Sequence, residues 1–154
     1  MFSLETYLNC DLKPSQVIHS FWLFEHKDEL VQKYPPSDGK WMQFYRKSQL
    51  DATWDLAKLK YRAGQLEGIS SMKVSTACES PRSSNSADGV ILFYCGPSND
   101  EQRIMYIGEK LLKEMPYKSL TGSMSYKSDK QTLGGTQATG QIVNHLYKLP
   151  CTRL

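Results

Sequence analysis

The sequence lacks the patterns that mark a metal site, a redox motif or a membrane span. Its four cysteines, Cys10, Cys78, Cys95 and Cys151, form no C-x-x-C pair, and none of the three histidines stands at metal-ligand spacing with another His or Cys. No apolar run approaches the roughly 20 residues that span a bilayer. We therefore expect no metal, no cofactor and no membrane partner, and reduced thiols in the cytoplasm or nucleus.

A strong charge bias is also missing. Lys and Arg total 19 against 16 Asp and Glu, a formal net charge of +3, which is small for a dedicated nucleic-acid binder. The first residues, "MFSLETYLNCDLKPS", contain no basic residue before Lys13 and do not resemble a signal peptide or an anchor. The length of 154 residues predicts one domain, 1–154, with an N-terminal extension at 1–16.

Six segments have the composition of β-strands. "GVILFYC" is continuously apolar, which is typical of a central strand covered on both faces, whereas "SMKVSTA" alternates between apolar and polar residues. Between these two segments, residues 79–89 have no periodicity and a helix-hostile composition, and we expect a flexible loop. The expected strands are residues 20–24, 40–45, 71–77, 89–95, 119–126 and 141–147.

Two segments have helical periodicity, and one of them has two apolar stripes. Residues 99–115 follow Ser98, place Glu101 at capping-box spacing, and gather their apolar side chains on one side. Residues 50–65 instead carry two opposed apolar stripes. The first contains Leu56, Leu59 and Ala63, and the second contains Leu50, Trp54, Ala57 and Tyr61.

A helix on a sheet needs only one apolar stripe, so the second stripe of residues 50–65 requires another explanation. We expect Leu56 and Leu59 to face the sheet. Leu50, Trp54 and Tyr61 are then covered by the N-terminal segment or bind an amphipathic helix of a partner protein. The expected core residues are Leu56, Leu59, Val90, Leu92, Ile104, Ile107 and Leu111.

The order of these elements resembles the translation initiation factor 4E fold. The likeness rests on "FWLFEHKDE", "LDATWDLAKL" and "ILFYCGPSNDEQRIMYIGEKLLKEM". The chain also resembles the uncharacterised family of the basophilic leukemia expressed protein, in "YPPSDGKWMQFY", the helix after it, and "SYKSDKQTLGGT". These resemblances imply an α/β (α+β) class with a curved, mainly antiparallel six-stranded sheet and two long helices on its convex face.

Binding a methylated cap requires two aromatic planes around the cationic base, a carboxylate and basic residues for the phosphates. At the position of the first plane this chain offers Tyr34, and the loop for the second plane, 79–89, has no aromatic residue. A strand pair that carries the family's phosphate-binding residues is also missing. We therefore do not expect cap recognition of the initiation factor 4E type, and we interpret Trp22 and Trp41 as core aromatics.

The stretch "YKSDKQTLGGTQATG", 126–140, is the strongest candidate for a ligand site. It groups two ammonium groups and several hydrogen-bonding side chains beside glycines, which allow close approach of a ligand. The alternative is a solvated loop in which Asp129 caps a turn. The candidate residues are Tyr126, Lys127, Ser128, Asp129, Lys130 and Thr132.

The function expected from the sequence is that of a non-catalytic binding module. Its ligand would be a nucleotide, RNA or another phosphate-bearing molecule, with a partner helix as a second candidate. A phosphothreonine lyase-like elimination enzyme is the alternative, with Lys127 as the base and His145 as the acid. No phosphate-binding cluster of arginines accompanies that pair, and a lone histidine on a strand is more often structural.

Overall fold

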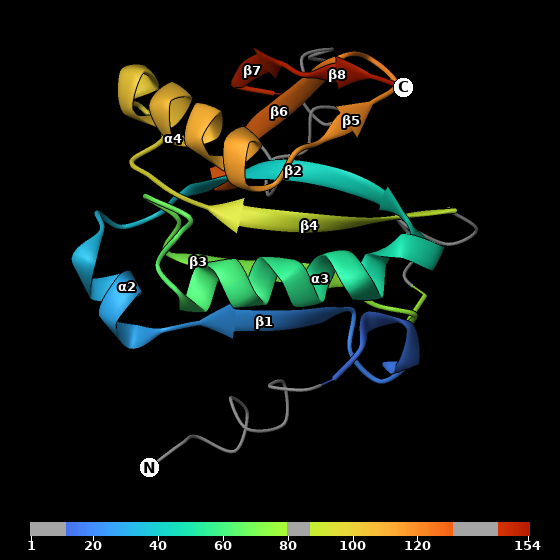
Figure 1. Ribbon diagram of the computed structural model, residues 1–154. Helices are drawn as coiled ribbons and strands as arrows, with labels where there is room; N and C mark the ends of the chain where they lie inside the picture. Colours follow the sequence, from blue (N-terminus) through green and yellow to red (C-terminus); the bar gives the residue numbers. More distant parts are fainter. Residues whose placement is uncertain (1–11, 80–86, 131–144) are drawn as a thin grey trace.

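The protein is built around one six-stranded sheet. The computed structural model describes residues 12–79, 87–130 and 145–154 (Figure 1). The strand order is β1-β3-β4-β2-β6-β7, and every neighbouring pair in it is antiparallel. The expected α/β class with a six-stranded antiparallel sheet and two long helices is confirmed.

The elements differ from the sequence expectation mainly at the two ends of the chain. A 3-10 turn, η1, and a short helix, α2, were not expected, and the segment 119–126 divides into two strands, of which β5 pairs in parallel with β8. Of the expected strand 141–147, Tyr147 is the first residue of β7, and 145–146 are not in a strand. Residues 141–144 and residues 80–86 of the expected loop lie outside the described residues. The bounds are η1 Pro14–Gln16, β1 Trp22–His26, α2 Asp28–Lys33, β2 Gly39–Arg46, α3 Lys47–Arg62, β3 Ser71–Ser75, β4 Asp88–Tyr94, α4 Glu101–Glu114, β5 Lys118–Ser119, β6 Ser123–Ser128, β7 Tyr147–Pro150 and β8 Thr152–Arg153.

Strand β4 lies near the middle of the sheet, as its apolar sequence predicts. Ile91 and Phe93 have no exposed surface on the helix side, and Leu92 is buried on the other side. Val90 is only half-buried, so its assignment to the core is wrong. Among the residues that the structure describes, no helix is long and apolar enough to cross a bilayer.

Helix α4 packs on the sheet through Ile104, Ile107 and Leu111, which are all buried as expected. The Trp41 indole on β2 donates from Nε1 to the carbonyl of Ile104 at 3.1 Å and fixes the helix against the strand. The helix begins after Asp100, whose carboxylate accepts from a backbone N–H in the first turn. The expected start at Ser98 is therefore two residues too early.

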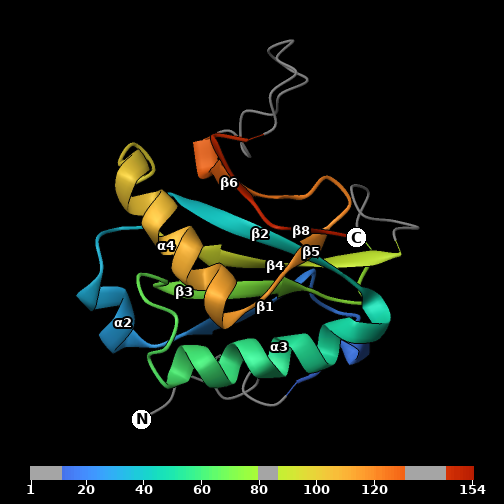
Figure 2. The same cartoon turned by 45° about the horizontal axis from the view of Figure 1, so that its top comes forward.

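Helix α3 lies on the same side of the sheet as α4, and its orientation reverses the expectation (Figure 2). Leu50, Trp54 and Tyr61 are at most 4% exposed, whereas Leu56 is 42% and Leu59 is 67% exposed. The stripe with the indole and the phenol faces the sheet because it buries far more apolar surface than the other stripe, which has two leucines and an alanine. The assignment of Leu50, Trp54 and Tyr61 to partner binding is therefore wrong, because they form the core.

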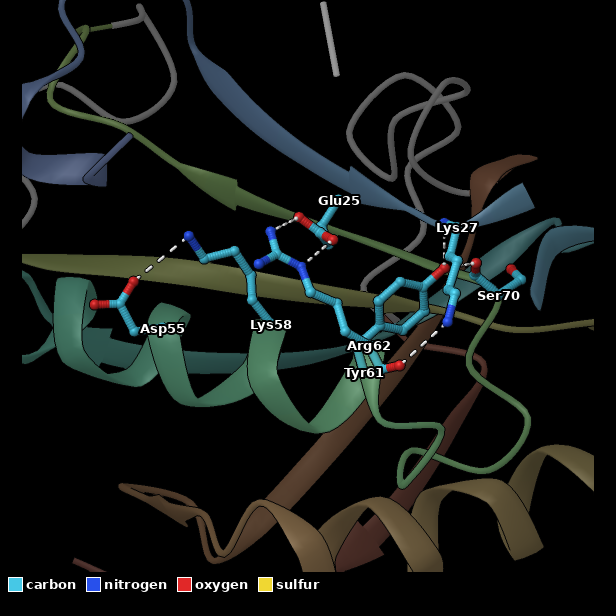
Figure 3. Close-up of polar contacts among 7 residues, drawn as sticks. All are labelled: Glu25, Lys27, Asp55, Lys58, Tyr61, Arg62 and Ser70. Carbon is cyan, nitrogen blue, oxygen red and sulfur yellow. Dashed lines mark hydrogen bonds and ion pairs between the residues drawn. The ribbon is translucent and has the colours of Figure 1, made fainter. Parts of the chain in front are cut away.

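Polar contacts hold the end of α3 in this orientation. The Tyr61 hydroxyl donates to the carbonyl of Ser70 and accepts from the backbone N–H of Lys27 at 2.9 Å. Next to it, the guanidinium of Arg62 binds both carboxylate oxygens of Glu25 at 2.8 Å (Figure 3). A bidentate pair of this kind fixes the angle between α3 and β1.

Candidate ligand-binding site

The sheet has a second face, which points away from α3 and α4 and is here called the distal face. Residues that lie directly opposite in an antiparallel pair share a face, so the register places side chains in rows across the strands. The row at one end of the sheet is His26, Ser71, Tyr94, Lys40 and Lys127, from β1, β3, β4, β2 and β6. Basic side chains from three strands therefore stand in one line.

The next row of the distal face is more apolar and contains a third lysine. It consists of Phe24, Lys73, Leu92, Met42 and Ser125, again one residue from each strand. Lys73 and Lys40 lie in adjacent rows, on β3 and β2, with β4 between them. Three lysines from separate strands, Lys40, Lys73 and Lys127, thus gather at one end of the distal face.

Lys73 lies among aromatic rings. Its Nζ is 4.4 Å from the ring centroid of Trp22, 5.6 Å from that of Phe24 and 5.9 Å from that of Tyr94. Among the described residues, this ammonium has no hydrogen-bond acceptor and no carboxylate within ion-pair distance. A ligand or water can supply the acceptor that the described residues do not provide.

The surroundings of Lys73 disfavour its charge. Partial burial lowers the pKa of Lys73 below its ordinary value, the nearby Lys40 lowers it further, and Asp129 acts in the opposite direction. An ammonium in this situation gains more from an added anion than a fully solvated one does, because less water competes for it.

A cavity of about 420 Å³ opens beside Lys73, here called the Lys73 pocket. Its size falls within the range of ligand pockets, about 300 to 1,000 Å³. Residues from β1, α2, β3, β4 and the chain after β6 line it. Those that matter here are Phe24, His26, Ser71, Lys73, Tyr94 and Asp129.

An ion pair fixes the wall of the Lys73 pocket beside β6. Lys40 Nζ lies 3.0 Å from Asp129 Oδ1, and the Lys40 side chain is only 5% exposed. The Asp129 backbone N–H also donates to the carbonyl of Asp38 at 2.7 Å. Asp129 therefore holds a buried lysine in place, and its carboxylate balances part of the positive charge of this end of the distal face.

The structure places the candidate residues of the 126–132 segment in different surroundings. Tyr126 has no exposed surface, and its hydroxyl donates to the carbonyl of Cys95 at 2.7 Å, so the expectation of a phenol that touches a ligand is wrong. Ser128 is buried, Asp129 lines the Lys73 pocket and Lys130 is exposed. Lys127 lies on the distal face in the row of Lys40. Thr132 lies outside the described residues.

The geometry does not favour the elimination pair. Strand β7 begins at Tyr147, which lies opposite Tyr126, so His145 lies two residues before the strand and outside its pairing with β6. No strand register therefore places His145 beside Lys127. The pKa of His145 is lowered by desolvation and then by Lys148, which reflects its own neighbours.

The two loops expected to supply the planes of a cap sandwich leave the sheet at opposite ends. Strand β1 ends at His26, which pairs with Ser71, the first residue of β3, whereas β3 ends opposite Trp22. The connection with Tyr34 follows β1, and the loop that includes Glu79 follows β3. Residues 80–86 of the loop for the second plane lie outside the described residues, and the expectation of no cap sandwich stays a prediction.

Sequence reasoning missed the residues that define the Lys73 pocket. Alternation in "SMKVSTA" already places Lys73 on the face opposite Met72 and Val74, and this was the available signal. The rings of Phe24 and Tyr94 approach Lys73 only through the pairing of β1, β3 and β4, which spans about 70 residues of sequence. No local pattern contains that information.

Comparison with known proteins supports the fold. No family model matches the chain, and no curated protein matches it. A schistosome eIF4E, solved in complex with m7GpppA and 4E-BP, is 14% identical with a TM-score of 0.64 over 93% of this chain and 78% of that chain. Ascaris suum eIF4E-3, solved with an m7G cap, is 14% identical with a TM-score of 0.60 over 99% and 83% of the two chains.

At these identities the likeness shows the fold alone. The expected initiation factor 4E-like architecture is confirmed, and membership of the basophilic leukemia expressed protein family stays a prediction. The aromatic rings, lysines and cavity of the distal face are properties of this chain, and the functional argument rests on them.

Proposed function

We propose that this chain is a non-catalytic binding module of the cytoplasm or nucleus, and that it binds a phosphate-bearing ligand, a nucleotide or the end of an RNA, in the Lys73 pocket. The observation that carries the proposal is the ammonium of Lys73, which lines a cavity of about 420 Å³ without a hydrogen-bond acceptor among the described residues. A phosphate oxygen is the acceptor that this group lacks.

The remaining residues of the Lys73 pocket suit the two parts of a nucleotide. Lys127 lies on the same face and adds positive charge for the phosphates, and the exposed Lys130 follows Asp129 near the pocket. Val31 and Phe24, which are 44% and 43% exposed, add apolar surface to the lining of the pocket for the base. Because these charges remain in contact with water, we expect modest affinity that falls as salt is raised.

The test is calorimetric titration of the chain with GTP and with guanosine. We expect saturable binding of GTP that weakens at higher salt, and much weaker binding of guanosine. Lys73→Met should reduce GTP affinity by about tenfold or more, the loss of one charge-assisted contact of about 1.5 kcal/mol. The matched control is Lys110→Met, which removes an identical charge from α4, beside the ring of Tyr106.

Two outcomes would contradict the proposal. One is the absence of saturable GTP binding to the folded wild-type chain. The other is an equal loss of affinity in Lys73→Met and Lys110→Met, which would show that net charge alone governs binding. The double variant Lys127→Met with Lys130→Met extends the test to the residues expected from the sequence, and we expect weaker GTP binding with a nearly unchanged melting temperature.

A second function, binding of an amphipathic partner helix, is supported by the outer stripe of α3. Leu56 and Leu59, one helical turn apart, are 42% and 67% exposed, and a similarly folded chain has been solved with 4E-BP. Fluorescence anisotropy with a labelled 4E-BP helix tests this function. Binding that Leu59→Glu abolishes would support it, and binding that is absent or insensitive to Leu59→Glu would exclude the stripe.

A further inference from the structure

The rings around Lys73 have the arrangement of a binding site for a cation. Trp22 and Phe24 stand two residues apart on β1 and therefore share its distal face, and Tyr94 stands on β4. Lys73 lies on β3, the strand between them, directly opposite Phe24. All three ring centroids lie within 6 Å of one nitrogen, at 4.4, 5.6 and 5.9 Å. Each of these distances is short enough for attraction between the ammonium and the ring face.

We propose that Trp22, Phe24 and Tyr94 form a cation site that the chain fills with its own Lys73 ammonium, so that the Lys73 pocket rejects external cations. A quaternary ammonium or a positively charged N-methylated base would have to displace a group that is covalently tethered to the site. It would also approach the charges of Lys73 and Lys40, and the repulsion between like charges opposes binding.

This inference concerns cations and does not depend on whether a phosphate-bearing ligand binds. It gives a second reason to expect no binding of a methylated cap, in addition to the lack of an aromatic residue in 79–89. The cationic base meets a ring site that is already occupied. Removing the lysine side chain should then create binding where the wild-type chain has none, a gain that the loss of a merely structural contact would not produce.

The experiment compares wild type, Lys73→Ala and Lys73→Met in titrations with tetramethylammonium chloride, with sodium chloride as the ionic-strength control. Both variants lose the charge, but only alanine empties the ring site, because methionine leaves a flexible apolar chain of nearly the same length in it. Tryptophan fluorescence reports binding, since Trp41 and Trp54 are fully buried whereas Trp22 is partly exposed.

We expect saturable binding of tetramethylammonium to Lys73→Ala, at least tenfold weaker binding to Lys73→Met, and no saturation with wild type. Adding Phe24→Leu to Lys73→Ala should abolish the gain. The proposal is overturned if folded Lys73→Ala shows no saturable response, if wild type binds as tightly as Lys73→Ala, or if Lys73→Met gains as much as Lys73→Ala, which would make charge the only determinant.

A measurement on the wild-type chain keeps the proposal testable if Lys73→Ala does not fold. A lysine side chain held over aromatic rings has ε-methylene protons that are shifted upfield by the ring currents. We expect one lysine with such a shift in the NMR spectrum of the wild-type chain, absent in Lys73→Met. If all ε-methylene protons resonate at their ordinary positions, the ring site is not occupied and the inference is wrong.

Discussion

Replacing Trp54 with alanine tests the orientation of α3, on which the separation of core and surface depends. The indole has no exposed surface, and truncating a buried tryptophan costs about 3 to 5 kcal/mol. Part of that cost is offset, because Nε1 of Trp54 is buried without a hydrogen-bond acceptor among the described residues, and the substitution removes this donor. We therefore expect a net loss of about 2 to 4 kcal/mol in the free energy of unfolding.

The control is Leu59→Ala, on the opposite stripe of the same helix, where the side chain is 67% exposed. Here we expect a change of less than about 0.5 kcal/mol. Urea denaturation followed by circular dichroism measures both, and with a slope of about 1 to 3 kcal/mol per M the Trp54→Ala midpoint should fall by about 0.7 M or more. Equal midpoints, or a larger loss for Leu59→Ala, would refute this orientation of α3.

Three further changes test the packing of α4, the ion pair of the Lys73 pocket and the behaviour at high pH. Gly108→Ala should lower the free energy of unfolding by up to about 2 kcal/mol, because the added Cβ would lie 2.5 Å from Trp41 Cζ2 and from Leu149 Cδ1. This overpacking exceeds the helix-propensity gain of about 1 kcal/mol, and a higher free energy of unfolding would show that the contact relaxes freely. Asp129→Asn should lower the free energy of unfolding by about 1.5 to 3 kcal/mol, because it weakens the pairing of the buried Lys40 ammonium. Lys40→Met should lower it less, because this variant removes the buried charge itself. The reverse order of the two losses in urea denaturation would refute this argument. Burial raises the pKa of Tyr94 to about 12 from an ordinary value of 10.0, so this group ionises in the unfolded chain first. The stability from Tyr94 is therefore present below pH 10 and is lost as pH rises through 12. In Tyr94→Phe the unfolding midpoint should depend less steeply on pH in this range, and an unchanged slope would contradict the argument.

The sequence predicts the class of the fold well because its signals are local. The continuous apolar run of β4, the alternation of β3 and the single apolar face of α4 each follow from neighbouring residues. The orientation of α3, in contrast, does not follow from a local signal. Both of its stripes satisfy the helical period, and the choice between them depends on contacts such as that of Tyr61 with Lys27 and Ser70, which only the folded chain brings together.

The candidate site shows the same limit. The segment around Asp129 and Lys127 could be identified from composition, and the structure places both residues at the basic end of the distal face. Tyr126 was misassigned because a tyrosine in a polar stretch does not reveal which face of its strand it occupies. Lys73 was missed because its aromatic neighbours come from other strands, and the register that pairs them is a property of the whole sheet.

The central claim is that the Lys73 pocket receives a phosphate-bearing ligand. NMR titration of the isotope-labelled chain with GTP tests it most directly, because it reports where the ligand lies. We predict saturable amide shift changes that concentrate on Ser71, Lys73, Tyr94, Lys40 and Asp129 and that are lost in Lys73→Met. Saturable changes that instead concentrate on α3, α4 or the second cavity of about 370 Å³ beside Phe44, or the absence of any saturable change, would contradict the claim.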